Sequence, residues 1–417
     1  MTTIAYITVQ FPSPVEWYVV EEIRELRRRG VRVIPCSVRR VNERTLGPGL
    51  REFAQETTYL EPLRLGRVLD AVWGCLTHAS RIGDLLKRIV LQGNEPVLKR
   101  MCALVHTLLG AYFGVLLRDC GVDHIHAHHG YFASWIALIA GRLSGIPYSL
   151  TLHGSDLLVH AAYLDTKLAE CKFCLTVSEF NRRHIAAHYP EVDLAKVRVQ
   201  RLGVETPADT VLSRKSYESQ APPLLLTVGR LHPVKNHVFL LQSCFLLREC
   251  GIPFRCWIAG EGPERRRLEF FMNELKLNDQ VTLLGHVPRR ELFEYYAEAD
   301  LVVLTSHSEG VPLVLMEAMA FGKVVLAPDI TGIPELVADG KTGFLYKPGA
   351  LEEFVWRAQQ IFGSLGALDT VRRAARQHVR MHFNQRKNLE RLGDLFLEQV
   401  AGAERSPADE NLVLQQI

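Results

Sequence analysis

Short apolar runs alternate with helical patterns along most of the chain, and this alternation predicts parallel sheets built from β–α–β units. The runs in the first half predict strands at 4–9, 31–37, 124–126, 149–152 and 173–177. The second half repeats the rhythm, with strands predicted at 224–228, 255–258, 281–284, 301–304 and 324–327. Helical spacing predicts helices at 19–29, 131–143 and 385–400, a helix after Ser178, and a helical Arg- and Leu-rich insert at about 60–118.

A polar stretch rich in proline and serine, residues 206–223, separates the two halves and predicts a linker. We therefore expect the following parts: a first domain at 1–205, a second at 224–384, a helix at 385–402 and a disordered tail at 403–417. Two α/β halves with one linker are typical of an enzyme that binds its ligand at the carboxyl ends of the strands, facing the other half.

The composition narrows the class of protein. With 47% hydrophobic and 23% charged residues, the chain of 417 residues has the balance of a soluble globular protein. A formal net charge of +3 argues against nucleic acid as a partner. Nine scattered cysteines argue against a disulfide framework and favour a reducing cytoplasm. We interpret Cys171 and Cys174 as core thiols rather than as a zinc or redox pair.

The most membrane-like stretch is 101–117, which is shorter than a typical span of ~20 residues and has basic residues on both sides. We interpret it as a buried or partly membrane-facing helix. The N-terminus has no basic region or cleavage site and runs directly into a strand pattern, so we expect no signal peptide. These features predict a cytoplasmic protein.

Two carboxylates eight residues apart, Glu309 and Glu317, enclose the most informative segment of the chain. Pro312 between them suits the first turn of a helix, where its missing N–H costs nothing. The free N–H groups of that turn favour an anion. One loop and helix can therefore present a carboxylate to sugar hydroxyls, a positive helix end to phosphate and a second carboxylate to a ribose.

This segment resembles the signature of the retaining nucleotide-sugar glycosyltransferases of family 4, with Gly310, Pro312, Ala318, Met319, Ala320 and Gly322 in register. The resemblance implies that the donor binds at Gly310, Val311, Pro312 and Leu313. The resemblance implies the GT-B fold: two Rossmann-like α/β domains facing each other across a cleft, with a C-terminal helix that crosses back to the first domain. It covers nearly the whole chain and is strongest from 224 to 347. The alternative without a function for this segment is a surface loop followed by an amphipathic helix that carries two glutamates.

Two cations follow the first predicted strand of the second half, in the sequence Gly229-Arg230-Leu-His-Pro-Val-Lys235. Gly229 permits close backbone approach, Arg230 offers a planar fork for phosphate oxygens and Lys235 a point charge. A diphosphate leaving group needs this neutralisation because negative charge grows on it as the glycosidic bond breaks. In the similar family the Arg and Lys hold the donor diphosphate. The alternative is a turn with solvated basic residues.

The resemblance also implies roles for residues after other strands. His286 and Val287 are expected to contact the nucleotide base through their backbone. His153 is expected beneath the donor sugar, where a histidine can donate or accept near neutral pH. Asp156 either orients a loop or caps a helix, and we place it on the acceptor side. Glu335 more plausibly braces a helix than contacts substrate.

A histidine cluster occupies the strand at 124–126 and the residues after it. Alternation places His124, His126 and His128 on one strand face, which makes a metal site conceivable. We expect no metal, because no carboxylate or thiol partner is evident nearby and the diphosphate is served by Arg230 and Lys235. The resemblance implies that His128 or His129 lies near the acceptor. Ser178 is interpreted as a helix cap or a cleft residue.

One departure from the family concerns the loop after the first strand, Gln10-Phe-Pro-Ser-Pro-Val-Glu-Trp17, which has no glycine. Close backbone approach to a phosphate is harder to argue there. The loop resembles the variant found in transferases of exopolysaccharide assembly, where it helps to define the acceptor. Trp17 and Tyr18 either stack on a sugar or pack the first helix.

We therefore predict a retaining hexosyltransferase without a cofactor that moves a sugar from a nucleotide-diphosphate donor to a glycan or lipid-linked saccharide, with His153 and Glu309 as catalytic residues. The alternatives are a nucleotide-sugar epimerase of the same fold and a non-catalytic nucleotide-binding subunit. An anionic membrane surface is a further predicted partner, with a solvated basic face as the equal alternative. The basic residues of the insert that predict it are Arg64, Arg67, Arg81, Lys87, Arg88, Lys99 and Arg100.

Overall fold

The computed structural model of the chain describes residues 1–92, 95–159, 162–207 and 221–401. Its contacts divide the chain into two compact units. Unit 1 holds Met1–Val177, Arg182–Gln200 and the residues from Leu389 onward, and unit 2 holds Ser178–Asn181 and Arg201–Asn388. The change from unit 1 to unit 2 at Arg201 comes five residues before the predicted linker, most of which, with the predicted tail, lies outside the described residues.

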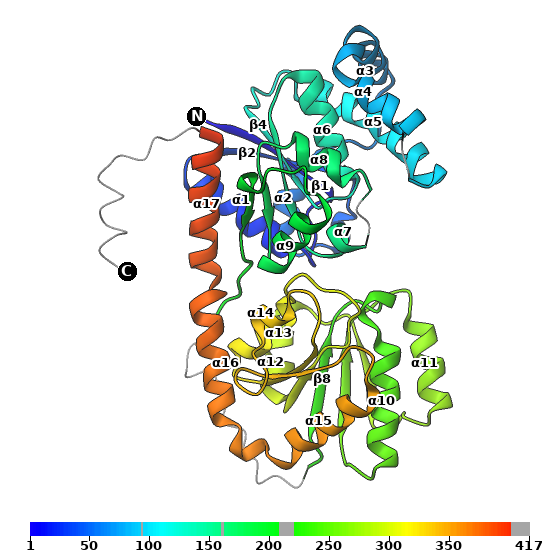
Figure 1. The fold of residues 1–417 in the computed structure, drawn as a ribbon, viewed down its shortest axis with the longest axis vertical. Coiled ribbons are helices and arrows are strands. Elements are labelled where there is room, and N and C mark those ends of the chain that lie inside the picture. The colour runs from blue at the N-terminus through cyan, green and yellow to red at the C-terminus, as the bar shows by residue number, and fades with distance from the viewer. Residues whose placement is uncertain (93–94, 160–161, 208–220, 402–417) are drawn as a thin grey trace, which may run out of the picture. The chain divides into compact units, whose positions relative to one another are not determined.

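Unit 1 is built on a parallel sheet of seven strands in the order β3-β2-β1-β4-β5-β6-β7 (Figure 1). The strands are β1 (Thr3–Gln10), β2 (Arg32–Arg39), β3 (Thr58–Tyr59), β4 (His124–His128), β5 (Tyr148–Leu152), β6 (Cys174–Thr176) and β7 (Val197–Val199). Every residue of β4 and β5 is buried, as expected for central parallel strands covered on both faces. The five predicted strands are confirmed, and the short β3 and β7 were not predicted.

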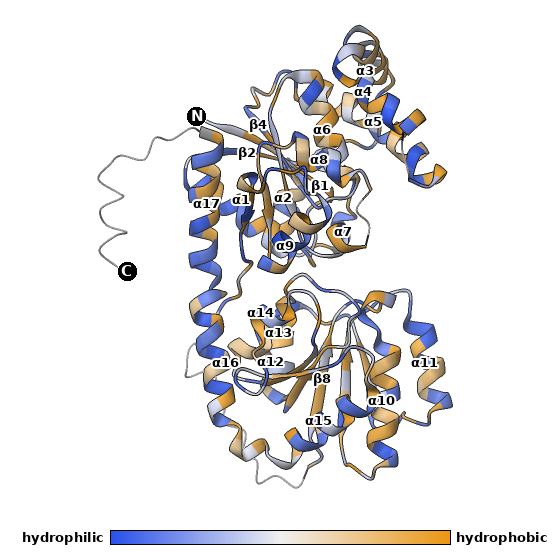
Figure 2. Cartoon of the chain, in the orientation of Figure 1, coloured by the Kyte–Doolittle hydropathy of each residue, from blue (hydrophilic) through white to orange (hydrophobic). Residues whose placement is uncertain are grey.

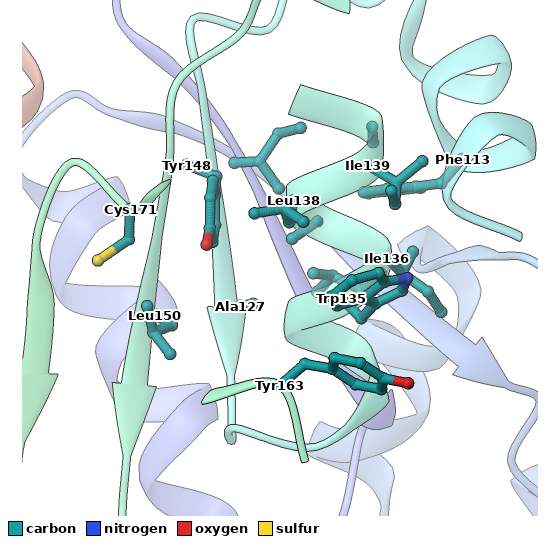
Figure 3. Packing of buried hydrophobic residues seen from close by; sticks show 14 of the residues in the cluster. Phe113, Ala127, Trp135, Ile136, Leu138, Ile139, Tyr148, Leu150, Tyr163 and Cys171 are labelled. Carbon is teal, nitrogen blue, oxygen red and sulfur yellow. The ribbon is translucent and has the colours of Figure 1, made fainter. Parts of the chain in front are cut away.

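The helices of unit 1 pack on both faces of this sheet and build its core around α6. The helices are α1 (Trp17–Arg28), η1 (Glu43–Thr45), α2 (Pro48–Glu56), α3 (Leu65–Thr77), α4 (Ala79–Lys87), the π-helical η2 (Arg88–Gln92), α5 (Val97–Leu117), α6 (Phe132–Ser144), α7 (Ser155–Leu158), α8 (Leu164–Glu170), α9 (Glu179–His188) and η3 (Leu194–Lys196). Figure 3 shows Trp135, Ile136 and Ile139 of α6 packed between the strands and Phe113 of α5.

Unit 2 repeats the design with a parallel sheet of six strands in the order β10-β9-β8-β11-β12-β13. The strands are β8 (Leu224–Val228), β9 (Arg255–Ala259), β10 (Val281–Gly285), β11 (Leu301–Val303), β12 (Val324–Pro328) and β13 (Phe344–Tyr346). The helices are η5 (Pro233–Lys235), α10 (His237–Glu249), α11 (Arg265–Glu274), α12 (Arg289–Glu298), α13 (Leu313–Ala320), α14 (Ile333–Leu336), α15 (Leu351–Gly363), η6 (Leu365–Ala367) and α16 (Asp369–His382). Figure 2 shows apolar residues gathered on the strands and on the helix faces that cover them.

The last helix, α17 (Gln385–Ala401), belongs to both units. Its first residues are in unit 2, and the rest of the described helix, from Leu389, belongs to unit 1. Leu392 and Phe396 are buried in a core cluster of unit 1 with Tyr6 and Phe173. The helix predicted at 385–402 is thus present, and its second part packs on the first domain, as the family resemblance implied.

Helix α5 is, within the described residues, the one helix long and apolar enough to cross a membrane by length and composition. Its inner face packs against α6, where Gly110 allows close approach: a Cβ at that position would lie 2.6 Å from Cβ of Ile139. Because Ala103, Phe113 and Leu117 of α5 are buried in the core of unit 1, we interpret α5 as a core helix with one outer face.

Candidate functional site

The loops that follow β8, β9 and β10 in unit 2 are fastened to one another at the carboxyl ends of the strands. The Gly229 N–H donates to the Ala259 carbonyl (2.9 Å), and the Gly260 N–H donates to the Gly285 carbonyl (2.8 Å). Gly260 has a φ of +155°, and a Cβ there would lie 1.8 Å from the Gly229 carbonyl oxygen, so glycine is required. The predicted Gly229 itself has open space, since an added Cβ would meet only the Lys235 side chain at 3.7 Å.

Lys235 and Glu309, two residues predicted to bind the donor, form an ion pair. Lys235 Nζ lies 2.6 Å from Glu309 Oε1, and the Ser306 hydroxyl donates to the same oxygen at 2.6 Å. The loops after β8 and β11 are also tied together by the Thr305 hydroxyl, which donates to the Lys235 carbonyl at 2.9 Å. Residues 74 positions apart in the sequence therefore meet at the end of the sheet.

Arg230 differs from Lys235 in being exposed. No hydrogen bond or ion pair of its guanidinium is formed within the described part of the chain. The loop thus holds one paired and one exposed cation, both of types that bind phosphate oxygens.

The start of α13 provides a set of backbone donors. Pro312 precedes the first helical residue, Leu313, with an extended ψ of 118°, so it lies one position before the first turn in which it was predicted. The Glu309–Gly310 loop is braced by the Thr331 hydroxyl, which donates to the Glu309 carbonyl at 2.6 Å. Among the described residues, no hydrogen-bond acceptor is assigned to the backbone N–H groups of Gly310, Val311, Leu313 and Val314. Four such groups ahead of a helix favour a bound anion.

Glu317 lies inside α13, is almost fully buried and has a partner for each carboxylate oxygen. The Tyr296 hydroxyl donates to Oε2 at 3.0 Å, and Arg289 Nε lies 3.4 Å from Oε1. Burial raises the pKa of Glu317, while Arg289 and Tyr296 oppose that shift. Both partners come from α12, so this carboxylate is held in a fixed position beneath the loop after β10. In that loop His286 is exposed and Val287 is partly buried.

The histidines of β4 share one face of the strand, as predicted, and two of them are bound inside the sheet. His124 Nε2 and His126 Nδ1 each lie 2.7 Å from the Ser149 hydroxyl of β5. His126 Nε2 also lies 3.0 Å from the Thr151 hydroxyl. Burial lowers the pKa of both imidazoles, to about 3 for His124, so both are neutral and structural near pH 7.

His128 connects a buried carboxylate to His153. Its Nε2 lies 2.8 Å from Glu22 Oε2 and 2.8 Å from the Tyr6 hydroxyl, and its Nδ1 lies 3.1 Å from His153 Nε2. His128 has no exposed side-chain surface, which corrects its predicted place at the acceptor: it positions His153 instead. His153 is partly exposed, and burial together with the charge of His129 and His128 lowers its pKa, which keeps it neutral.

A second chain of charges runs through His129. Its Nε2 lies 3.0 Å from Glu16 Oε1 and its Nδ1 lies 3.6 Å from Asp156 Oδ2. Burial would lower the pKa of His129, but the two carboxylates raise it to about 10, so the imidazole carries a positive charge. Its side chain is 14% exposed, so part of the imidazole is accessible.

Asp156 is buried, and its carboxylate accepts hydrogen bonds from the N–H groups of Gly130 (2.9 Å), Gly154 (2.8 Å) and His153 (3.1 Å). It lies within α7 rather than before it, so the loop-orienting interpretation holds and the capping one does not. With 1% of its side chain exposed, Asp156 offers almost no surface to a ligand, and its predicted place on the acceptor side stays a prediction. Through His129 and the N–H of His153 it fixes the two histidines that flank it.

Two helix-bracing interpretations are confirmed. The Ser178 hydroxyl accepts from the Asn181 N–H at 3.1 Å, which caps the start of α9. Glu335 accepts from the N–H groups of Glu179 (3.1 Å) and Phe180 (2.6 Å) in the same turn. The Cys171 and Cys174 thiols are buried and free, as expected of core thiols. Within the described residues, no group of three or more His, Cys, Asp or Glu side chains is arranged to hold a metal ion.

Unit 1 also contains a largely apolar cavity of about 320 Å³ beside the loop after β4. Its lining includes Tyr131, Phe132 and Trp135, together with Lys99 and Ala103 of α5. The buried Lys167 lies at its wall and donates to the carbonyls of Gly130 (2.7 Å), Tyr131 (3.0 Å) and Ala162 (2.8 Å). Burial lowers the pKa of Lys167 to about 7.

Sequence reasoning missed the partners Glu16, Glu22, Tyr6, Lys167 and Tyr296. The residues next to the histidine cluster in the sequence include no carboxylate partner, but α1 supplies Glu22, and the residue before α1 is Glu16, both more than 100 positions away. One signal was present: Glu22 interrupts the buried stripe that Val19, Ile23 and Leu26 form on α1. A charged residue within an apolar stripe predicts a buried partner.

Two parallel α/β units, one of which carries an exposed arginine and directed backbone N–H groups on its strand-end loops, are typical of proteins that bind a ligand at the carboxyl ends of their strands. Two family models match the chain: Glycosyltransferase Family 4 over residues 15–207 and Glycosyl transferases group 1 over residues 210–378. The chain therefore belongs to the family 4 glycosyltransferases.

Curated relatives agree with this assignment over part of their length. The chain is 34% identical over 202 residues (46% of the chain and 48% of the relative) to a protein of Escherichia coli named as a colanic acid biosynthesis glycosyltransferase. It is 32% identical over 215 residues (49% and 51%) to the amylovoran biosynthesis glycosyltransferase of Erwinia amylovora. The chain thus spans about half the length of the curated relatives it matches.

Solved structures show the fold over almost the whole chain. Sucrose-phosphate synthase from Thermosynechococcus elongatus has a TM-score of 0.73 at 18% identity, with 97% of this chain and 100% of that chain covered. HepE from Anabaena, solved in complex with UDP, has a TM-score of 0.67 at 18% identity, with 95% and 100% covered. The two Rossmann-like units and these likenesses confirm the predicted GT-B fold.

Proposed function

We propose that the protein transfers a sugar from a nucleoside-diphosphate sugar to a hydroxyl group of a glycan or lipid-linked saccharide in exopolysaccharide biosynthesis. The observation that carries the proposal is the loop geometry of unit 2. An exposed Arg230, the Lys235 ammonium and the N–H groups before α13 lie on loops at one end of the sheet. Together they supply charge and directed donors for a diphosphate, on which negative charge grows during transfer.

In this proposal the roles of Glu309 and Lys235 depend on each other. In the structure the Lys235 ammonium forms an ion pair with the Glu309 carboxylate. A bound diphosphate would compete for the ammonium, which leaves Glu309 to accept hydrogen bonds from hydroxyls of the donor sugar. Glu317, fixed by Tyr296 and Arg289, is assigned to the ribose.

The proposed reaction retains the anomeric configuration. The described residues around Glu309 offer no separate base for a displacement, so we assign the acceptor proton to the leaving diphosphate on the same face of the sugar. The bond from the anomeric carbon to the diphosphate breaks as the bond to the acceptor oxygen forms. His153 is assigned to a hydroxyl of the donor sugar, because a neutral imidazole can both donate and accept.

UDP is the first nucleotide to consider, because HepE, whose fold this chain shares, was solved with it. For the acceptor, the cavity beside Phe132 and Trp135 favours a saccharide that carries an apolar group. We propose that no metal ion is needed, since Arg230 and Lys235 already supply the positive charge. Activity is therefore expected to persist in EDTA.

The proposed location is the cytoplasm, at the inner face of a membrane. The basic residues of the insert, from which a membrane contact was predicted, fall into two groups: some bond to the protein, and others do not. Arg81 donates to the Leu143 carbonyl, Arg88 pairs with Asp165, and Arg100 donates to the Ile89 carbonyl. Four basic side chains of the insert form no hydrogen bond or ion pair among the described residues and remain for anionic lipid: Arg64, Arg67, Lys87 and Lys99.

The test is incubation of the protein with UDP-glucose, UDP-galactose, GDP-mannose and ADP-glucose, with nucleoside diphosphate release as the readout. Water can serve as the acceptor hydroxyl when no saccharide is present, so we expect slow release from one donor and first appearance of the retained anomer by NMR. Glu309→Gln should abolish the release. Conversion of a donor into an epimeric nucleotide sugar would instead identify an epimerase. Binding of a nucleotide without any release would identify a non-catalytic subunit.

A further inference from the structure

The helical insert of unit 1 has an exposed apolar surface that the proposed reaction does not use. Of the twenty large hydrophobic side chains that are exposed in the described residues, fourteen lie between Leu63 and Leu108. The other six are scattered over both units. Concentration of this kind marks an interaction surface, because monomeric soluble proteins rarely expose large contiguous apolar patches.

Eleven of these fourteen residues form one stripe on each of two helices. On α3 the stripe consists of Leu65, Leu69, Val72, Trp73 and Leu76, with exposures of 40–77%. On α5 it consists of Val97, Leu98, Met101, Leu104, Val105 and Leu108, with exposures of 38–75%. The spacing of three and four residues places each set on one face of its helix.

The two striped helices belong to one packed group. α3 packs against α5, and α5 packs against α6 through its small residues, so the stripes are the faces left over after the core is complete. Figure 1 shows α3, α4 and α5 together beyond α6, and Figure 2 shows apolar residues along these helices. A helix with its core face satisfied and a second apolar face exposed needs a second apolar environment.

We propose that this surface embeds in the interfacial layer of a lipid bilayer, with Trp73 and the leucines of α3 and α5 among the lipids. The charges around it favour a bilayer. Residues 61–100 contain seven basic and four acidic residues, and two of the acids, Asp84 and Glu95, pair with arginines of the protein. Apolar faces with Trp and Leu beside basic residues are typical of helices that lie in a membrane interface. Asp70, which borders the α3 stripe, is the exposed acid of that helix.

The cavity of unit 1 provides a second reason for lipid. Lys99 and Ala103 line the cavity, and they belong to the same helix as the α5 stripe. Helix α5 alone would therefore separate a lipid chain in the bilayer from the apolar cavity beside the loop after β4. If a second copy of the protein covered the stripe, the closeness of the stripe to the cavity would have no explanation.

Electrostatic attraction and apolar embedding differ in how they respond to salt. Attraction by basic residues alone would be lost in high salt, where the Debye length is about 3 Å at 1 M. Embedded apolar side chains are not screened by salt. We therefore expect binding to vesicles of phosphatidylcholine and phosphatidylglycerol to weaken in 1 M NaCl but to persist, and binding to vesicles of phosphatidylcholine alone to be measurable.

The first experiment measures sedimentation of the full chain with both kinds of vesicle, without donor or acceptor. The double variant Leu69→Asp/Leu76→Asp should lower the partition coefficient at least about tenfold. Phe270→Asp, an equally exposed apolar residue on α11 of unit 2, serves as the matched control and should bind as the wild type does. Equal melting temperatures would show that the variants are folded.

The second readout is tryptophan emission. Trp73 is 68% exposed on the α3 stripe, and Trp356 is 53% exposed on α15 of unit 2. Vesicles should shift the emission to shorter wavelength in the wild type and in Trp356→Phe, but not in Trp73→Phe.

Three results would overturn the inference: no binding to either vesicle, unchanged binding of the Leu69→Asp/Leu76→Asp variant, or a lipid-free dimer that this variant converts to a monomer. The last result would identify a second copy as the occupant. Because vesicle binding is measured without nucleotide, its failure leaves the transfer reaction untouched, and failure of donor turnover leaves this surface untouched.

Discussion

At the residue scale, the protein places charges in pairs and chains that the order of residues does not reveal. Lys235 and Glu309 neutralise each other on the loops of unit 2, whereas Arg230 is left exposed. In unit 1, Glu22 contacts His128, and Glu16 contacts His129. His153, which lies beside His128, has a lowered pKa and is neutral, whereas His129 has a raised pKa and is charged. Such separation of protonation states is typical of functional sites.

The charge on His129 predicts a pH dependence of stability. Because its pKa is raised to about 10 from the usual value near 6.5, its ion pairs contribute fully below about pH 6.5, and the contribution is lost as pH rises toward 10. We expect the difference in melting temperature between the wild type and His129→Gln to be largest near pH 6 and to disappear near pH 10. Lys167 titrates in both proteins and cancels in the difference. A difference independent of pH would contradict this account.

At the element scale, most strands of the two sheets and the helices that cover them were predictable from the sequence, because each has a run or a regular spacing of apolar residues. The strand at 224–228 matches β8, and the last helix was predicted to within a residue. The strands that were missed, β3, β7 and β13, have two or three residues and lack a longer apolar run around them. β6 and β11 are equally short, but they lie within the apolar runs at 173–177 and 301–304. Loop geometry was also out of reach, since the bracing of Gly310 by Gly332 depends on two loops meeting in space.

That bracing predicts the effect of a small substitution. A Cβ at Gly332 would lie 2.0 Å from the Gly310 carbonyl oxygen, so Gly332→Ala must displace the loop before α13. We expect a loss of about 1–3 kcal/mol in the free energy of unfolding and weaker nucleotide binding. Gly363→Ala is the control, since a Cβ there meets nothing within 4 Å. Denaturant unfolding and nucleotide titration of both variants provide the test, and a Gly332→Ala protein that binds nucleotide normally would refute the bracing role.

At the scale of the whole molecule, α17 joins the two units in one continuous helix. Phe396 on its second part contacts His126, with ring centroids 4.9 Å apart, and Phe173 at 5.5 Å. The core of unit 1 is therefore completed by residues that follow unit 2 in the sequence. The periodicity of the last helix predicted the helix, and only the family resemblance predicted where it packs.

Removal of this contact should destabilise unit 1. Phe396→Ala is expected to cost about 3–5 kcal/mol of the free energy of unfolding, because the ring is buried and leaves a cavity. Arg391→Ala, an exposed position on the same helix, should be neutral. Equal stability of the two variants would show that unit 1 does not depend on α17.

The central claim is that the loops of unit 2 bind the diphosphate of a nucleotide sugar, and thermal melting with UDP, GDP and ADP tests it most directly. A nucleotide at about 100 times its dissociation constant adds about 2.7 kcal/mol of stability, which raises the melting temperature visibly. We predict such a rise with one nucleotide. It should be greatly reduced in Arg230→Ala and preserved in Arg255→Ala, whose arginine is exposed at the first residue of β9, the end of that strand opposite the loops. No rise with any nucleotide, or an equal rise in Arg230→Ala, would contradict the assignment of this site.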